Sequence, residues 1–187
     1  MREYAEFINQ VAKRIHELDP HHPVALSNGE TFGLRSYAKY APDVDIFGVN
    51  SYRRPGFGTL WQEVQSSYDK PVLLTEFGTL KPRLVDSRLD EVSQAEEHRA
   101  AWCDVERHTA GKQTPGNAIG GFAYEWLDEW WFDGQPSEHD AGSHGINNEW
   151  HGLASQGDGQ DSPRQRTLRK AYFIYQKLWK SGELRCE

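Results

Sequence analysis

Residues 71–78 read Pro71-Val72-Leu73-Leu74-Thr75-Glu76-Phe77-Gly78. A short apolar run bounded by residues that break regular structure is typical of a strand buried in a parallel sheet. This run ends on the carboxylate of Glu76, and Gly78 follows where the chain can turn. In parallel α/β folds the carboxyl ends of the strands carry the chemistry. Glu76 is therefore predicted to act as a nucleophile or as a general acid or base.

Strand and helix patterns alternate along the rest of the chain. Strands are predicted at residues 24–28, 46–52, 70–76 and 119–126, and helices at 3–18, 60–67, 89–110 and from 163 onward, with a short helical turn at 35–40. Alternation of this kind indicates a parallel sheet with right-handed crossovers. The predicted fold class is therefore α/β, with helices that flank parallel strands.

Composition excludes several classes of function. The 187 residues suit one domain of ordinary size. The net charge is −7, and no stripe of Lys and Arg is present, which argues against nucleic-acid binding. No apolar run is long enough to span a membrane. We therefore expect no nucleic-acid partner and no membrane span.

The two cysteines are predicted not to form a bridge. Cys103 falls inside a predicted helix, and Cys186 is one residue from the end of the chain. A buried thiol and a free thiol in the tail are the simplest interpretation of these positions.

A segment at residues 128–162 is rich in Gly, Asp, Asn, His and Ser and is far longer than an ordinary connection. Such a loop is typically functional or disordered. His139, Asp140 and His144 lie close together in it, and Asp158 and Asp161 faintly suggest a calcium loop, but neither group has a recognised ligand spacing. We therefore predict no metal site and no cofactor.

Each predicted strand ends in polar or aromatic residues, and strand ends of a parallel sheet meet at one rim. These residues are Asn28, then Asn50 with Tyr52, then Glu76, and finally the cluster Glu125-Trp126-Leu127-Asp128-Glu129. They are candidates for one site. The alternatives are that Asn28 is an ordinary turn residue, that Glu76 pairs with an arginine, and that Trp126 packs beneath the long loop.

Several of these segments together resemble one enzyme group. Thr75-Glu76-Phe77-Gly78 after an apolar strand resembles the nucleophile strand of the clan A glycoside hydrolases, TIM-barrel enzymes that include families 2, 5 and 72. Four further segments resemble this clan in the same order, namely residues 18–24, 44–52, 120–126 and 148–153. The resemblance covers nearly the whole chain. It implies a single partial catalytic domain over residues 1–187, corresponding to strands 5 to 8 of a (β/α)8 barrel.

The resemblance also implies a mechanism and residue roles. Retaining glycosidases use one carboxylate as nucleophile and a second as acid/base, about 5–5.5 Å apart. Glu76 would be the nucleophile, and Tyr52 would donate a hydrogen bond that holds its charge. Trp126 would stack on a sugar ring. The remaining expected contacts to an oligosaccharide or polysaccharide come from Asn28, Asn50, Asp128 and Glu129.

The second carboxylate of the clan has no clear counterpart. In the clan it is a Glu that follows an Asn at the end of the fourth strand, whereas only Met1 and Arg2 precede the first predicted helix here. Asn148-Glu149 has the same two residue types, but it follows the last predicted strand. The acid/base is therefore expected to be absent or to be Glu149. Four strands cannot close a barrel, so a homo-oligomer or a missing N-terminal half-barrel is expected.

Two other interpretations remain. A non-catalytic carbohydrate-binding or scaffold fragment would keep the aromatic rim without using Glu76. An unrelated flavodoxin-like domain would need a phosphate loop after its first strand, and Asn28-Gly29-Glu30-Thr31-Phe32-Gly33 is not a glycine-rich dinucleotide fingerprint.

Overall fold

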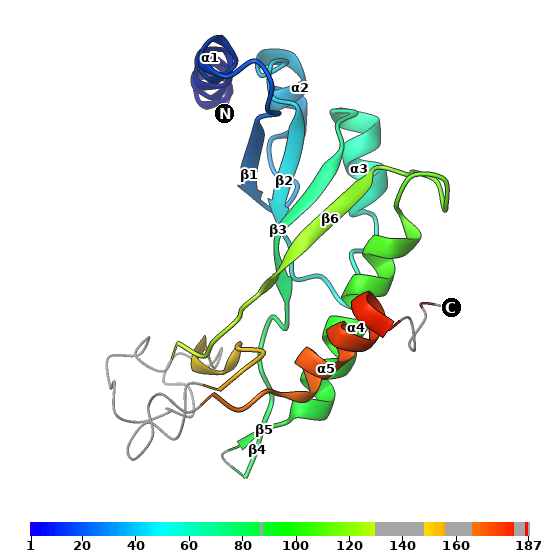
Figure 1. Ribbon diagram of the computed structural model, residues 1–187. Helices are drawn as coiled ribbons and strands as arrows, with labels where there is room; N and C mark the ends of the chain where they lie inside the picture. Colours follow the sequence, from blue (N-terminus) through cyan, green and yellow to red (C-terminus); the bar gives the residue numbers. More distant parts are fainter. Residues whose placement is uncertain (87, 130–147, 156–165, 182–185, 187) are drawn as a thin grey trace. The chain divides into compact units, whose positions relative to one another are not determined.

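The computed structural model describes residues 1–86, 88–129, 148–155, 166–181 and 186. The chain is a mixed α/β protein (Figure 1). Its elements are α1 (Arg2–Leu18), β1 (Ala25–Gly29), α2 (Leu34–Tyr40), β2 (Ile46–Asn50), α3 (Leu60–Ser67), β3 (Val72–Gly78), β4 (Leu84–Val85), β5 (Arg88–Leu89), α4 (Glu91–Arg107), β6 (Ala118–Tyr124), η1 (Asn148–Trp150), α5 (Lys170–Gln176) and η2 (Lys177–Ser181).

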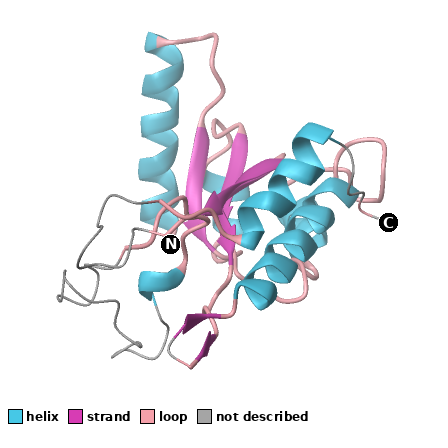
Figure 2. Cartoon of the chain, turned by 60° about the horizontal axis from the view of Figure 1, so that its bottom comes forward, coloured by secondary structure: helices cyan, strands magenta, loops and turns pink. Residues whose placement is uncertain are grey.

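One sheet carries the predicted strands, in the order β1-β2-β3-β6. Figure 2 shows the strands in magenta and the helices in cyan. β1 pairs with β2, and β2 pairs with β3, in parallel. This confirms the predicted parallel sheet, and the four strands lie within two residues of the predicted starts and ends. The short antiparallel pair β4 and β5 is not expected from the sequence, because two-residue strands leave no periodic pattern.

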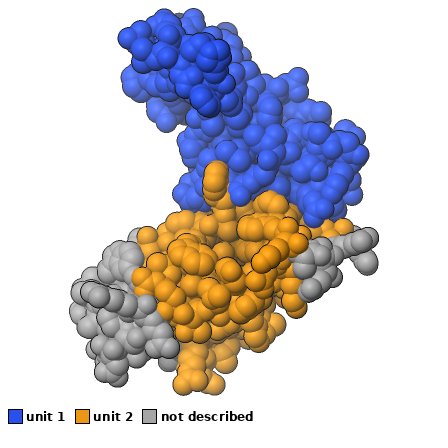
Figure 3. All heavy atoms as spheres, viewed as in Figure 1, with its two compact units in different colours: residues 1–51, 57–76, 104–121 blue, residues 52–56, 77–103, 122–187 orange. Residues whose placement is uncertain are grey.

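The chain divides into two compact units (Figure 3). Unit 1 comprises residues 1–51, 57–76 and 104–121, and unit 2 comprises residues 52–56, 77–103 and 122–187. β3 passes from unit 1 to unit 2 directly after Glu76.

The core of unit 1 lies on one face of its strands. Alternate residues such as Phe47 of β2 and Leu74 of β3 are fully buried, as the period of two in a strand requires. Tyr37 of α2 lies near Phe47, with ring centroids 6.4 Å apart, and Trp61 of α3 stacks on His108 at 5.2 Å. Side chains from the strands and from the helices that connect them therefore form one continuous core.

The opposite face of the strands carries apolar side chains such as Ile46 as well as polar ones such as Thr75. Gly48 of β2 lies on this face, where an added Cβ would lie 2.2 Å from the Leu26 carbonyl oxygen and 2.8 Å from Cγ2 of Thr75. Both distances are far below van der Waals contact. The missing side chain of Gly48 therefore gives room to the Thr75 methyl group.

α1 buries its small residues and exposes its large apolar ones. Ala5 and Ala12 are buried, whereas Tyr4, Phe7 and Val11 are exposed, Phe7 to 60%. A cavity of about 230 Å³ lies between this exposed face of α1 and the segment 24–27. The periodicity predicts the helix correctly, but the described residues do not cover its large apolar side chains.

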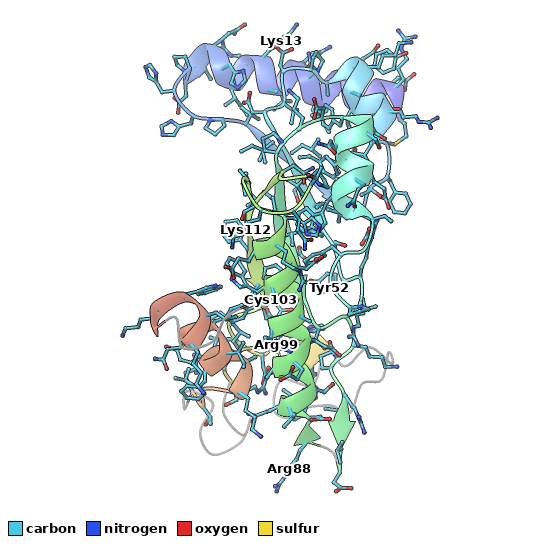
Figure 4. All side chains as sticks on the ribbon, turned by 90° about the vertical axis from the view of Figure 1, so that its right-hand side faces the viewer. Lys13, Tyr52, Arg88, Arg99, Cys103 and Lys112 are labelled. Carbon is cyan, nitrogen blue, oxygen red and sulfur yellow. A yellow bond between two sulfur atoms is a disulfide. The ribbon has the colours of Figure 1, made fainter. Side chains whose placement is uncertain are left out.

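Unit 2 is built around α4 and the C-terminal helices. The Tyr175 hydroxyl and Nδ1 of His98 are 2.8 Å apart in a hydrogen bond, and Trp102 packs edge-on against Trp179 at 4.9 Å. This packing brings the end of the chain to α4, where Cys103 lies (Figure 4).

The prediction of two free cysteines is wrong, because Cys103 and Cys186 form a disulfide. The two residues are 83 positions apart in the chain, and their Cα atoms lie 5.1 Å apart. Position near the C-terminus suggested a free thiol for Cys186. Docking of α5 on α4, which local sequence does not reveal, places it next to Cys103.

Within the ranges that the structure describes, no helix is long and apolar enough to cross a membrane.

Candidate active site

Glu76 lies at the carboxyl end of the unit 1 part of β3, where an irregularity in the sheet sets its direction. Val49 of β2 pairs with Leu74, but the next residue, Asn50, pairs with Glu76. Thr75 is therefore an extra residue, which makes this position a β-bulge. Bulges redirect side chains and are frequent beside active sites. In an unbroken ladder Asn50 would face Thr75, and Glu76 would point to the other side of the sheet.

The bulge brings both Thr75 and Glu76 to the side chain of Asn50. The Asn50 amide N–H donates to Oε1 of Glu76 at 2.6 Å, and the Thr75 hydroxyl donates to Oδ1 of Asn50 at 2.6 Å. The hydroxyl groups of Thr75 and Ser27 are 2.9 Å apart. Two residues predicted for the site, Asn50 and Glu76, are therefore in direct contact, and two that sequence reasoning missed, Ser27 and Thr75, support them.

Asn50 donates a hydrogen bond to the Glu76 carboxylate, and the hydrogen bond expected from Tyr52 to Glu76 stays a prediction. Tyr52 begins unit 2, and its ring packs edge-on against Tyr124 with centroids 6.5 Å apart. Tyr124 also contacts the His151 ring at 5.4 Å and donates its hydroxyl to Oε2 of Glu129 at 3.2 Å. Tyr52, Tyr124, Glu129 and His151 thus form one cluster in unit 2.

Tyr124 was not predicted for the site, whereas Trp126 was. Tyr124 could have been found from its position, because it is the last residue of β6. Trp126 lies two residues beyond the strand and is 54% exposed. It packs near Tyr172 and lines a cavity of about 310 Å³ together with Tyr172 and Trp179. Trp126 is therefore an accessible aromatic platform, beside the last helices of unit 2.

The Asn28 side chain is hydrogen-bonded to the segment that follows β1, and its predicted contact with substrate is not tested by these bonds. Its amide N–H groups donate to the carbonyl oxygens of Glu30 at 2.8 Å and Phe32 at 3.0 Å. Its Oδ1 accepts a hydrogen bond from the Tyr37 hydroxyl at 2.9 Å. These bonds use both ends of the side chain to close the connection from β1 to α2, as the turn interpretation of Asn28 expects.

Asp128, which was expected to contact substrate, is held by hydrogen bonds within unit 2. Its side chain is fully buried. The carboxylate accepts two hydrogen bonds from the Arg169 guanidinium and a third from the Gly152 N–H at 3.0 Å. Burial raises the pKa of Asp128 to about 6, and Arg169 and the Gly152 N–H act in the opposite direction. The described contacts of Asp128 are therefore contacts within the fold, and a contact with substrate stays a prediction.

Glu149, the alternative acid/base, lies in η1 and is fully buried. A general acid must reach the leaving oxygen directly or through one water molecule, and a fully enclosed side chain does not. Among the residues that the structure describes, no group of three or more His, Cys, Asp or Glu side chains is arranged to hold a metal ion. His139, Asp140, His144, Asp158 and Asp161 lie outside the described residues.

Two buried histidines in unit 2 make the stability of the chain sensitive to acid. Burial lowers the pKa of His98 and of His151 to about 4, from about 6.5 in an unfolded chain. The unfolded state therefore binds more protons below pH 6.5, and the folded state loses stability as the pH falls. Asp128 acts in the opposite sense between pH 6 and 4. We expect a net loss of about 2 to 3 kcal/mol between pH 7 and pH 5.

Urea denaturation at the two pH values measures this difference. His151→Phe should reduce the acid effect, because the substituted ring has no proton to gain. His21→Phe, at an exposed histidine, is the matched control and should leave it unchanged. Equal stability of the parent chain at pH 7 and pH 5 would contradict the lowered pKa values of His98 and His151 in the folded chain.

Comparison with known proteins supplies the broader context for this geometry. No family model matches the chain, and no curated protein matches it. Several solved structures do match the chain. An FMN-binding β-glucuronidase from Facaelibacterium prausnitzii L2-6 matches with a TM-score of 0.64 and 16% identity over 96% of this chain and 27% of its own. The fold is glycoside hydrolase-like.

Two further solved structures support the same fold. A GH2 β-galacturonidase from Eisenbergiella tayi matches with a TM-score of 0.61 and 17% identity, over 97% of this chain and 31% of its own. A β-D-glucuronidase from Dictyoglomus thermophilum matches with a TM-score of 0.59 and 19% identity, over 94% of this chain and 29% of its own. The chain thus spans less than a third of each of these proteins. At such identities the likeness concerns the fold alone, and it is consistent with part of a TIM barrel.

Proposed function

We propose that this chain is the nucleophile-bearing part of a retaining glycoside hydrolase, with Glu76 as the nucleophile. One observation carries the proposal, namely the hydrogen bond of 2.6 Å from the Asn50 amide to Oε1 of Glu76 at the carboxyl end of a parallel sheet. An amide donor fixes the direction of the carboxylate, and a carboxylate oxygen held in place is the group that attacks in the retaining mechanism. The likeness of the fold to glycosidases supports the same interpretation.

In the proposed reaction Glu76 attacks the anomeric carbon and displaces the leaving oxygen, which takes a proton from an acid. The resulting glycosyl ester is then hydrolysed by water. Among the described carboxylates, Glu149 and Asp128 are fully buried. We propose that the acid/base comes from a second polypeptide segment, either an N-terminal half-barrel or a second copy of the chain, that completes strands 5 to 8 of the proposed barrel.

The need for such a partner leads to a prediction about association. Within the described residues, β1 and β6 each have a neighbouring strand on one side only, and α1 exposes Tyr4, Phe7 and Val11. Exposed strand edges and apolar faces favour association. We expect the purified chain to elute as an oligomer, with its mass measured by light scattering. A stable, monodisperse monomer would contradict this expectation.

Trapping of the glycosyl ester tests Glu76 itself. A leaving group that needs no protonation removes the requirement for the acid, so 2-deoxy-2-fluoro-glycosyl fluorides are the probes. Solved neighbours that are named glucuronidases and a galacturonidase suggest that uronic acid derivatives be tried beside neutral sugars. Mass spectrometry should find one sugar on the peptide that contains Glu76.

Two variants make the trapping experiment decisive. Glu76→Gln should abolish the adduct, because an amide does not attack the anomeric carbon. Glu96→Gln, which changes an exposed carboxylate on α4, is the matched control and should retain it. An adduct that survives in Glu76→Gln would refute the assignment, and so would its absence with every sugar tried.

A second candidate function is carbohydrate binding without catalysis. The cavity of about 310 Å³ beside Trp126 favours it, because Trp126 and Trp179 are both exposed aromatic side chains in its lining. Aromatic faces stack on the apolar face of a sugar ring. In that case Trp126→Ala would abolish oligosaccharide binding measured by calorimetry, and Glu76→Gln would not change it.

A further inference from the structure

We propose that Thr75 and Ser27 are positioning residues, which fix the amide of Asn50 so that its N–H, and not its carbonyl oxygen, faces Glu76. The inference rests on the proposed function, since it assigns a role around the proposed nucleophile. All four side chains belong to unit 1. Together they form a line of hydrogen bonds across β1, β2 and β3 on the face of the sheet opposite the core.

The direction of each hydrogen bond follows from the number of available protons. A hydroxyl group has one proton to donate, whereas a primary amide has two donors on nitrogen and an acceptor on oxygen. The Thr75 hydroxyl donates its proton to Oδ1 of Asn50 at 2.6 Å. Its oxygen is left as the acceptor for the Ser27 hydroxyl at 2.9 Å. Asn50 then donates its N–H to Glu76 at 2.6 Å, so the series of hydrogen bonds ends on the carboxylate.

The opposite orientation of the Asn50 side-chain amide is disfavoured at both its oxygen and its nitrogen. If the Asn50 side chain turned over, its carbonyl oxygen would face Oε1 of Glu76, which is also an acceptor. Its NH2 group would face the Thr75 hydroxyl, whose own proton would then lose its acceptor on Asn50. The Ser27 hydroxyl is also 3.4 Å from Oδ1 of Asn50, but its single proton is already assigned to the nearer Thr75 oxygen. The two hydroxyl groups therefore select one of two amide orientations.

The local backbone explains why this arrangement requires Thr75. Thr75 is the additional residue of the bulge, so it shares Asn50 with Glu76. Its Cγ2 methyl lies over Gly48, where an added Cβ would approach it to 2.8 Å. The methyl group therefore fills the space above Gly48 while the hydroxyl faces Asn50. Thr75→Val keeps the shape and removes only the hydroxyl, and Thr75→Ser keeps the hydroxyl and removes only the methyl.

Nuclear magnetic resonance of the 15N-labelled full chain tests the proposal without any sugar. The side-chain NH2 signal of Asn50 is assigned by its loss in Asn50→Asp, and its exchange with water is measured. In the parent chain the proton that is bonded to Glu76 should be protected. Thr75→Val should accelerate exchange about five- to tenfold, the effect of losing one hydrogen bond that selects the orientation. Thr75→Ser should restore the parent rate.

Ser27→Ala gives an independent measurement at an exposed position, where a folding defect is not expected. It should accelerate exchange about twofold, because Ser27 acts mainly through Thr75. Unchanged exchange in both Thr75→Val and Ser27→Ala would overturn the proposal. Equal acceleration in Thr75→Val and Thr75→Ser would also overturn it, because that result would assign the effect to packing over Gly48.

The trapping reaction separates this proposal from the proposed function. If the parent chain forms the glycosyl adduct, Thr75→Val should slow its formation about tenfold, and Thr75→Ser should restore it. If no adduct forms while Asn50 exchange responds as expected, glycosidase chemistry is refuted and the orientation of Asn50 by Thr75 and Ser27 is supported.

Discussion

Arg169→Met should destabilise the chain by about 3 to 5 kcal/mol at pH 7, which is the usual cost of removing one partner of a buried ion pair. Asp128 is 0% exposed, and the guanidinium of Arg169 provides two of the hydrogen bonds to its carboxylate. Arg169 also donates to the Gly152 carbonyl oxygen at 2.7 Å. Without Arg169 a buried negative charge and a buried carbonyl oxygen lose their partner together.

The pH dependence of this variant tests the physical cause. Burial already raises the pKa of Asp128 to about 6 with Arg169 present, and removal of the cation should raise it further. The variant can then protonate Asp128 on mild acidification, so its deficit relative to the parent chain should shrink between pH 7 and pH 5. Urea denaturation at both pH values measures the deficit.

A surface ion pair provides the matched control. Arg99 on α4 (Figure 4) pairs with Glu96 at 3.0 Å, and the two side chains are 39% and 58% exposed. Arg99→Met should therefore change stability by less than about 1 kcal/mol. If Arg169→Met and Arg99→Met had similar effects, the pair of Arg169 and Asp128 would not hold unit 2 together as described.

Removal of the disulfide should cost about 4 to 5 kcal/mol, because a crosslink across 83 residues strongly restricts the unfolded chain. The double variant Cys103→Ala/Cys186→Ala leaves no free thiol and only a small change at the buried Cys103. Its urea midpoint should lie well below that of the oxidised parent chain.

Reductant supplies the control for this measurement. Dithiothreitol should bring the parent chain to the stability of the double variant, and it should leave the double variant unchanged. Equal midpoints for the oxidised parent chain and the double variant would show that the disulfide contributes nothing to stability.

Local patterns were sufficient to predict the strands and the position of Glu76. The run from Val72 to Leu74 is apolar because β3 is buried, and a parallel sheet brings its end to Asn50. The same reasoning did not reveal the bulge. A regular strand places Thr75 and Glu76 on opposite faces, so only the observed pairing shows that both side chains meet Asn50.

Contacts that are distant in sequence account for the remaining differences. Asp128 lies in a polar cluster after β6, but its partner Arg169 is 41 residues away. Cys186 meets Cys103 only because α5 packs on α4. Asn28 is the opposite case, since all its described partners lie within nine residues. For Asn28, the turn interpretation of the sequence agreed with the structure.

The disulfide also determines what a protease would leave behind. A single cut at any peptide bond between Cys103 and Cys186 divides the polypeptide into two fragments that stay covalently joined. After a cut between Cys103 and Tyr175, the C-terminal fragment carries Tyr175, whose hydroxyl group is hydrogen-bonded to His98 on the other fragment. A nicked chain therefore migrates as one species on a denaturing gel until reductant is added, and its two halves remain close enough to reassemble after unfolding.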